Sequence, residues 1–96
     1  MNLQQRLEQA KDPGTAPSEL ESLAADPHAF VRWCIARNPS THAALLERLA
    51  ADQDAVVRLR VAQHPSTPPA ALERLAADAD LAVRRAAEAE AARRRA

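Results

Sequence analysis

The amino-acid sequence predicts an all-α protein, an α-solenoid of three two-helix repeats with a helical cap at each end. The first observation is a period of 26 residues: 12–37, 38–63 and 64–89 align without a gap, and ten columns are identical in all three copies. The second is a pair of apolar stripes with helical spacing in each copy. The third is the scarcity of glycine: the chain has only one, and a sequence with so little glycine favours helices over hairpins. Repeats of this length bury their apolar faces only against their neighbours, so they stack.

The first helix of each repeat is expected to begin after a threonine, a residue type preferred as an N-cap. Two leucines at i and i+3 and an alanine at i+4 then form a stripe toward the core, and a glutamate points outward. The threonines are Thr15, Thr41 and Thr67; the leucine pairs are Leu20/Leu23, Leu46/Leu49 and Leu72/Leu75; the glutamates are Glu21, Glu47 and Glu73.

The second helix of each repeat is expected to follow an aspartate that ends the first helix and serves as an N-cap. In the first repeat Pro27 then takes the first helical position. The helices end before Pro39 and Pro65, because a residue that precedes proline is pushed away from the α region. The aspartates are Asp26, Asp52 and Asp78, and the core-facing i, i+4 pairs are Val31/Ile35, Val57/Val61 and Val83/Ala87.

An arginine stands six residues after each of these aspartates, in the pairs Asp26/Arg32, Asp52/Arg58 and Asp78/Arg84. On helical geometry the arginine flanks the core and can reach the aspartate of its own repeat or of an adjacent one. Strict repetition favours a buried ladder of ion pairs that joins the repeats, since a ladder needs every rung. The alternative is a column of arginines that binds anions.

The pattern N-P-S-T-x-x-A-L-x-x-L-A-x-D-x-x-x-x-V-R-x-x-V-A resembles the leucine-rich repeat variant family over about residues 12–89. Its L-A-x-D-x-x-x-x-V-R portion is also similar to HEAT repeats. The resemblance implies alternating helices without a sheet, and it allows one helix of each repeat to be partly 3₁₀. Some members of the family carry a cysteine-rich iron–sulfur segment before the repeats. This chain has only Cys34, inside a repeat, so no cluster is carried over.

Both ends of the chain are predicted to be caps. Residues 1–11 match the second half of a repeat, so Leu3 to Lys11 is expected to form a lone helix that covers the first repeat. At the other end no proline interrupts the last helix, which should extend through residues 90–96 with a polar outer face. We therefore expect a single repeat domain, 1–96, that is a complete small protein.

Composition restricts the classes of function. The formal net charge is zero, so no general basic field recruits nucleic acid or anionic lipid. No apolar run approaches the length of a membrane span, and the N-terminus has no apolar core of a signal peptide. A single cysteine fits a reducing cytoplasm. Twelve arginines against one lysine, with abundant alanine, suggest a GC-rich bacterial genome.

The residues that could act in catalysis or bind a metal or a phosphate have simpler structural interpretations. Cys34 is expected to be a partly packed, inert thiol, because a nucleophile needs an exposed position with a base nearby. His28, His42 and His64 occupy unrelated columns, so no metal site is expected, and His64 stands before a proline as a turn cap. The run Arg93–Arg95 is expected to be a solvated helix end that complements the helix dipole rather than a phosphate site.

Two columns of the second helices carry large apolar residues that packing in the core does not explain. The residue two positions after the core valine of each second helix lies about 200° away, on the opposite, exposed face. This column and the one three residues before it place both aromatic residues of the chain in an apolar stripe across the repeats. The apolar stripe consists of Leu7, Phe30, Trp33, Val56 and Leu59. Contiguous exposed apolar area marks interaction sites. The alternative is that Phe30 and Trp33 pack on the N-terminal cap helix as part of the core.

We therefore expect a non-catalytic protein-binding module, an adaptor or scaffold, or a homodimer that associates through the apolar stripe. No cofactor, nucleic acid or membrane is expected as a partner, and catalysis has no convergent acid, base or nucleophile to support it. The alternative function is nucleic-acid binding by a HEAT-like module through its arginine columns, which comprise Arg37, Arg58, Arg60, Arg84 and Arg85.

Overall fold

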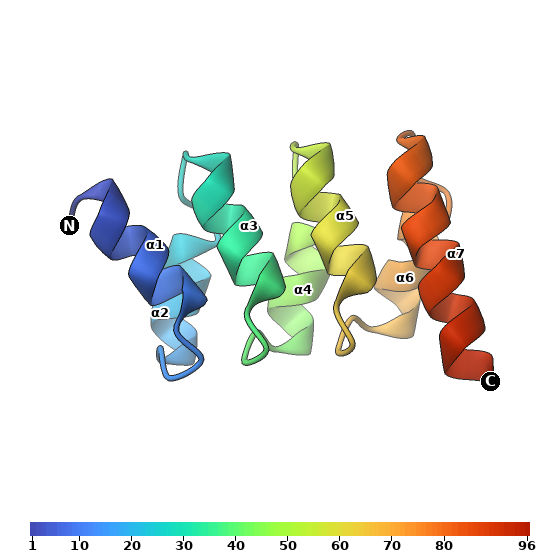
Figure 1. Ribbon diagram of the computed structural model, residues 1–96, viewed down its shortest axis with the longest axis horizontal. Helices are drawn as coiled ribbons and strands as arrows, with labels where there is room; N and C mark the ends of the chain where they lie inside the picture. Colours follow the sequence, from blue (N-terminus) through green and yellow to red (C-terminus); the bar gives the residue numbers. More distant parts are fainter.

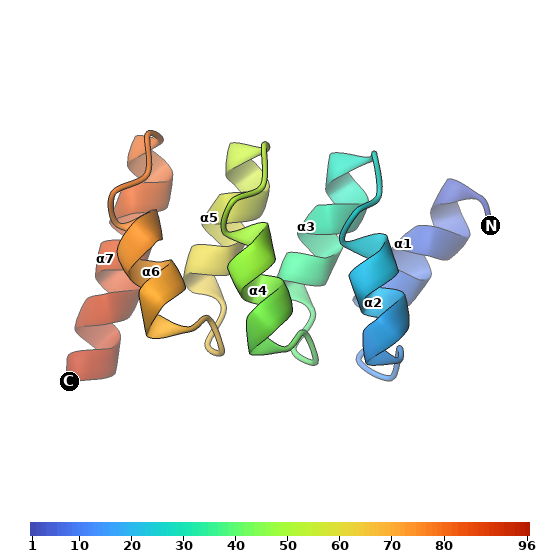
Figure 2. The same ribbon diagram turned by 180° about the vertical axis from the view of Figure 1, so that it is seen from behind.

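The computed structural model describes residues 1–96 as seven α-helices without a strand. The longer helices lie side by side in one layer, and the shorter ones form a second layer behind them (Figures 1 and 2). The molecule measures 40 × 23 × 16 Å along its principal axes. The prediction of an all-α repeat fold is therefore confirmed. The first layer contains α1 (Leu3–Lys11), α3 (Ala29–Arg37), α5 (Ala55–Gln63) and α7 (Leu81–Arg95); the second contains α2 (Pro17–Leu23), α4 (Ala43–Leu49) and α6 (Pro69–Leu75).

The core consists of aliphatic side chains. The predicted leucine pairs of α2, α4 and α6 are buried, with at most 6 % of any side chain exposed. The predicted i, i+4 pairs of α3, α5 and α7 are buried as well, and Ala10 extends the core to α1. Helical periodicity alone selects these positions, because each helix turns the same columns toward its neighbours.

The threonines that recur in every repeat bond the end of the preceding helix and do not begin the next one. Thr41 Oγ1 donates to the Ile35 carbonyl at 2.7 Å, and Thr67 Oγ1 donates to the Val61 carbonyl at 2.6 Å. Both threonines are buried, and each satisfies a carbonyl that the end of a helix leaves without an intrahelical partner. The prediction of threonine N-caps is therefore wrong: the N-caps of α2, α4 and α6 are Ala16, His42 and Pro68.

The aspartates that recur in every repeat are not N-caps either. The N-caps of α3, α5 and α7 are the residues two positions later, His28, Asp54 and Asp80. Each aspartate instead accepts the backbone N–H of that residue through Oδ1, at 2.9 Å in all three repeats. Pro27 consequently lies in the turn and not at the first helical position. This turn leaves the Oδ2 atom of every aspartate free to meet an arginine.

The arginine that each aspartate meets belongs to the preceding repeat, 20 residues earlier. Arg32 Nε lies 2.8 Å from Asp52 Oδ2, and both side chains are 7 % exposed. Arg58 Nε lies 2.8 Å from Asp78 Oδ2. At the N-terminus Arg6 Nε makes the same bond to Asp26 Oδ2 at 2.6 Å. The ladder is therefore present, and the arginines of these rungs are taken up by carboxylates.

Each ladder arginine also holds its own repeat, through the main chain. Arg32 Nη1 donates to the Asp26 carbonyl and Arg58 Nη1 to the Asp52 carbonyl, both at 2.7 Å. Arg84 makes the same bond to the Asp78 carbonyl at 2.8 Å but has no carboxylate partner. One guanidinium thus connects two successive repeats. Both expected partners are present: the arginine bonds the aspartate carbonyl of its own repeat and the aspartate carboxylate of the next repeat.

A second seam joins the repeats at the other end of the longer helices. Asn38 Nδ2 donates to the Asp12 carbonyl at 3.0 Å, and His64 Nε2 donates to the Asn38 carbonyl at 2.9 Å. Each side chain also accepts the backbone N–H two residues later, from Ser40 and Ser66. His64 is therefore the neutral tautomer with its hydrogen on Nε2, and its predicted role as a turn cap is confirmed.

The C-terminal helix keeps this seam with a different side chain. Glu90 occupies the column of Asn38 and His64 and is buried, with bonds from Arg93 and Arg94. Arg94 then reaches back to the Thr67 carbonyl at 2.8 Å and to the His64 carbonyl at 3.3 Å. All seven helices are α-helical, so the partly 3₁₀ helix that the resemblance allowed is absent; i→i−3 bonds such as Asp26 N–H to the Leu23 carbonyl lie in the turns.

Three carboxylates of the two seams, Asp26, Asp78 and Glu90, have pKa values below their ordinary ones. The hydrogen bond from Arg58 outweighs burial and lowers the pKa of Asp78, while Asp78 raises the pKa of Arg58. Burial raises the pKa of Asp26 and of Glu90, but hydrogen bonds outweigh it and leave both below their ordinary values. These bonds come from the His28 N–H and Arg6 for Asp26, and from Arg93 and Arg94 for Glu90.

Arg32→Ala is expected to lower the free energy of unfolding by about 3 kcal/mol, because it leaves the buried Asp52 carboxylate without its counter-charge. Arg84→Ala is the matched control, since Arg84 bonds only carbonyls, and it should lower that free energy by about 1 kcal/mol. Urea denaturation of both variants measures the difference. Equal losses would contradict a structural role for the ion pair.

The contribution of Asp26, Asp78 and Glu90 to stability is expected to be constant above about pH 5 and to be lost below about pH 4. The pKa values of Asp26, Asp78 and Glu90 are lowered by folding, so their contribution is present above the unfolded values and is lost as pH falls through the folded ones. Thermal melts across this range measure the slope. Glu90→Gln should make the fall shallower, and an unchanged melting temperature at pH 3 would refute the assignment.

Candidate functional site

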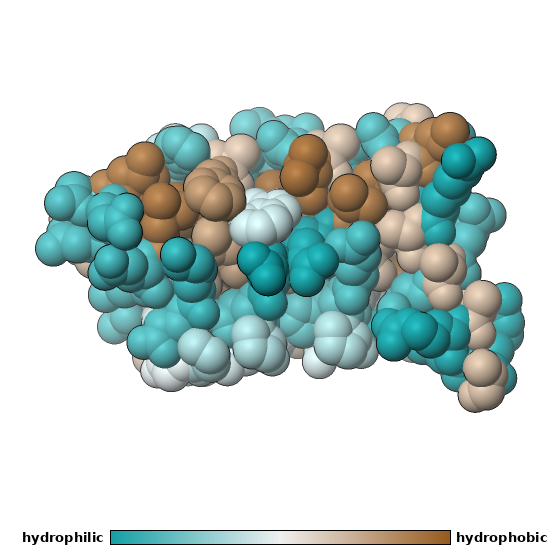
Figure 3. All heavy atoms as spheres, in the orientation of Figure 1, coloured by the Kyte–Doolittle hydropathy of each residue, from teal (hydrophilic) through white to brown (hydrophobic).

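The most exposed large apolar side chains of the helices gather on the layer of longer helices. Phe30 is 49 % exposed, Val56 is 57 % exposed and Leu81 is 50 % exposed. Phe30 and Val56 are the second residues of α3 and α5, and Leu81 is the first residue of α7. Figure 3 shows the result as a band of hydrophobic surface along one edge of this face, over the N-terminal halves of these helices.

The remaining members of the apolar stripe lie deeper. Leu7, Trp33 and Leu59 are half-buried and pack against the core. The rings of Phe30 and Trp33 have their centroids 5.3 Å apart at an angle of 34°. The apolar stripe therefore has an exposed upper row, Phe30 and Val56, supported from beneath by side chains that also contribute to folding.

Of the two interpretations of the aromatic residues, surface exposure fits Phe30 and packing on the core fits Trp33. Phe30 is exposed, as expected for a surface residue, whereas Trp33 is partly packed and so has a share in the core. The sequence did not identify Leu3 and Leu81, which are exposed at the two ends of the apolar stripe. Both belong to a column that holds alanine in the two middle copies, so only the first and last copies show that this column is exposed and apolar.

A shallow pocket opens in the apolar stripe between α3 and α5. It has a volume of about 320 Å³ and is lined by five apolar residues together with one N-cap carboxylate: Ala29, Phe30, Trp33, Asp54, Val56 and Val57. A pocket of mostly apolar walls beside two exposed apolar side chains suits one bulky apolar side chain of a partner.

Basic side chains lie beside the apolar stripe: Lys11, Arg37 and Arg60 are in the last turns of α1, α3 and α5, and Arg85 takes the place in α7 that Trp33 and Leu59 have in α3 and α5. Arg37 is exposed, and its guanidinium carbon lies 5.0 Å from the centre of the Trp33 ring, a cation–π contact. Arg60 donates to Gln63 Oε1 at 2.7 Å, while Lys11 and Arg85 are exposed. We refer to Lys11, Arg37, Arg60 and Arg85 as the basic row.

The structure does not bring all five arginines of the nucleic-acid hypothesis into one free surface. Arg58 is bonded to Asp78 and to the Asp52 carbonyl, so it belongs to the ladder. Arg84 bonds the carbonyls of Asp78 and Ala79. Three of the five therefore belong to the basic row: Arg37, Arg60 and Arg85.

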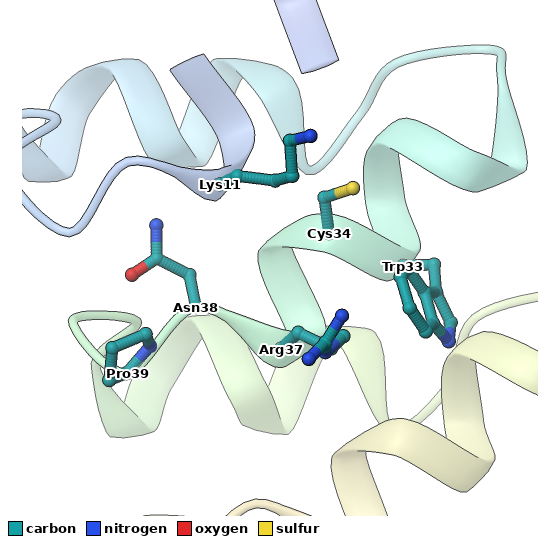
Figure 4. Close-up of a pocket in the computed structure, with 6 residues that line it drawn as sticks. All are labelled: Lys11, Trp33, Cys34, Arg37, Asn38 and Pro39. Carbon is teal, nitrogen blue, oxygen red and sulfur yellow. The ribbon is translucent and has the colours of Figure 1, made fainter. Parts of the chain in front are cut away.

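A second pocket, of about 230 Å³, lies where α1 meets α3, lined by Lys11, Trp33, Cys34, Arg37, Asn38 and Pro39 (Figure 4). Figure 4 shows that Lys11 enters it from the end of α1 and Cys34 from α3. Cys34 is only 1 % exposed, so it is fully buried rather than partly packed. Burial raises the pKa of the Cys34 thiol, despite the nearby charges of Lys11 and Arg37, so the thiol stays protonated and is a poor nucleophile.

The histidines hold structural positions far apart in the chain. His28 and His42 are the N-caps of α3 and α4, and His42 Nε2 lies 3.1 Å from Glu21. His64 lies in the seam between repeats. No three His, Cys, Asp or Glu side chains come together in a way that could hold a metal ion. No helix combines the length and the apolar character that a membrane crossing requires.

Comparison with protein families identifies the repeat. A family described as the leucine rich repeat variant domain matches residues 4–59, more than half of the chain. A second, described as the leucine rich repeat variant, matches residues 55–80. No curated protein and no solved structure matches the chain.

Phe30→Ala is expected to change the free energy of unfolding by less than about 1 kcal/mol, because half of its side chain is already in water. Trp33→Ala should lower it by about 2 kcal/mol or more, since the indole packs on the core. Chemical denaturation followed by circular dichroism measures both variants. If Phe30→Ala is as damaging as Trp33→Ala, the exposed row belongs to the core and is not a free surface.

Proposed function

The chain belongs to the leucine-rich repeat variant family, and on that premise we propose that it is a non-catalytic protein-binding module, an adaptor or scaffold. Its contact surface is the apolar stripe. A lone buried thiol suits a reducing compartment, and twelve arginines against one lysine suit a GC-rich bacterial genome, so the proposed location is a bacterial cytoplasm.

One observation supports this proposal above the others: Phe30 and Val56 are exposed at equivalent positions of neighbouring repeats. A residue at the second position of α3 or α5 does not contribute to the core, so packing does not account for a large apolar side chain there. Aligned exposed side chains form contiguous area, which on monomeric proteins is typical of binding sites. Aromatic residues beside a pocket are also the type most enriched among the residues that dominate binding energy.

Binding is favoured over catalysis by the state of the chemical groups. Cys34 is buried with a raised pKa, and the buried His64 uses both ring nitrogens in hydrogen bonds. The arginine ladder is likewise engaged in holding the repeats together. The side chains exposed on the layer of longer helices include Phe30 and Val56 of the apolar stripe and most of the basic row, which suit recognition.

A photo-crosslinking amino acid at position 30 is expected to capture one protein from a lysate of the host, whereas the same group at position 73 should not. Position 73 lies in α6, in the other layer, and carries an exposed glutamate. Gel electrophoresis and mass spectrometry detect and identify the adduct, and Val56→Asp should abolish it.

Adducts of equal yield at positions 30 and 73, or an adduct at position 30 that survives Val56→Asp, would contradict binding at the apolar stripe. Light scattering separates the two kinds of partner, since a homodimer that forms through the same surface doubles the mass of the purified chain. Tight binding to mixed-sequence DNA with a steep salt dependence would instead favour the nucleic-acid alternative.

A further inference from the structure

We propose that the apolar stripe binds an amphipathic helix with one acidic flank, laid across α1, α3, α5 and α7. This partner class rests on the proposed function, to which it adds a shape and a sign of charge. Three features carry it: the spacing of the longer helices, the pocket between α3 and α5, and the basic row beside the apolar stripe.

The spacing of the longer helices matches the repeat of a helical partner. Packed helices lie about 8–10 Å apart, and an α-helix rises about 1.5 Å per residue, so a crossing helix meets the next ridge about every five to seven residues. Apolar residues with a heptad spacing would therefore each meet one repeat. Three heptads, about 21 residues, cross the four longer helices within the 40 Å length of the molecule.

The pocket between α3 and α5 gives such a helix an anchor point. It lies between the exposed side chains of Phe30 and Val56 at the centre of the row, so a bulky apolar residue of the partner can enter it. Leu3 and Leu81 extend the exposed apolar surface to α1 and α7, so the residues one heptad before and after the anchor also meet apolar side chains.

The charges beside the apolar stripe differ between its two edges. At the N-terminal edge, Asp54 and Asp80 already accept the N–H groups of Val56 and Val83 as N-caps. At the C-terminal edge Lys11, Arg37 and Arg60 offer positive charge, and Arg85 adds a cation on α7; none of the four forms an ion pair. The guanidinium of Arg37 is also held over the Trp33 ring, next to the apolar surface. A partner with carboxylates along the flank facing this edge matches both the apolar and the charged surface.

Two other occupants match this surface less well. A nucleic acid would meet only the four cations of the basic row, since Arg58 is taken by Asp78, and the Asp54 carboxylate lines the pocket beside the stripe. A second copy of the chain would offer only two N-cap carboxylates beside its own apolar stripe, Asp54 and Asp80, and would bring a second basic row to the contact.

The probes are two designed 21-residue helical peptides with leucine in a heptad pattern. One carries glutamate along a single flank, and the other carries lysine at the same positions. Trp33 is the only tryptophan and the chain has no tyrosine, so its fluorescence reports binding directly. The acidic peptide is expected to bind at least about tenfold more tightly at low salt, and the preference should shrink as salt screens the charges.

The double variant Arg37→Glu with Arg60→Glu is expected to reverse the preference between the two peptides. Its matched control is Arg48→Glu with Arg74→Glu, which changes the net charge equally on α4 and α6, in the other layer, and should keep the preference for the acidic peptide. Circular dichroism confirms that both variants are folded.

Equal affinity for the two peptides, lost in Val56→Asp, would overturn the acidic flank while leaving the proposed function intact. Affinity for neither peptide would also overturn it, and the crosslinking at position 30 then decides the proposed function separately. Tighter binding of a 20-base-pair DNA duplex than of the acidic peptide would assign the surface to nucleic acid. A concentration-dependent dimer that Val56→Asp dissolves would assign it to a second copy of the chain.

Discussion

The guanidinium of a ladder arginine is bound at both of its ends, and the alignment of the repeats depends on this double attachment. Arg32 holds the Asp26 carbonyl of its own repeat and the Asp52 carboxylate of the next one. A buried ion pair adds little net stability over an apolar pair, but breaking it leaves a charge that is costly to bury. The ladder therefore penalises any other register, while the leucine and valine columns supply the favourable burial.

The opposite seam shows that a repeated role does not require a repeated residue. An amide in Asn38, an imidazole in His64 and a guanidinium in Arg94 each place an N–H on a carbonyl of the preceding repeat. The last case needs Glu90 because the helix continues through this column, where the earlier repeats turn before a proline. The two seams together hold both ends of the longer helices, so these helices stay aligned in a row.

Helical periodicity predicted the seven helices and the core columns, because it depends only on residues within one helix. It could not decide the partner of each arginine: aspartates 6 residues before and 20 residues after were both in reach, and the stacking of repeats makes the choice. The threonines were misplaced for a related reason, since a hydroxyl can cap the helix before it or after it. Trp33 was expected on the exposed face by its angle, but its size lets it reach the core from there.

The position of the apolar stripe follows from the ladder. Holding the N-terminal ends of α3 and α5 at equal height brings their second residues, Phe30 and Val56, into line, so single exposed side chains become one ridge. The ladder and the seams tolerate any side chain at these two positions, since neither side chain takes part in them. The exposed apolar ridge and the cations beside it are thus formed by side chains that folding leaves free, and the proposed contact with a complementary surface would give both of them a role.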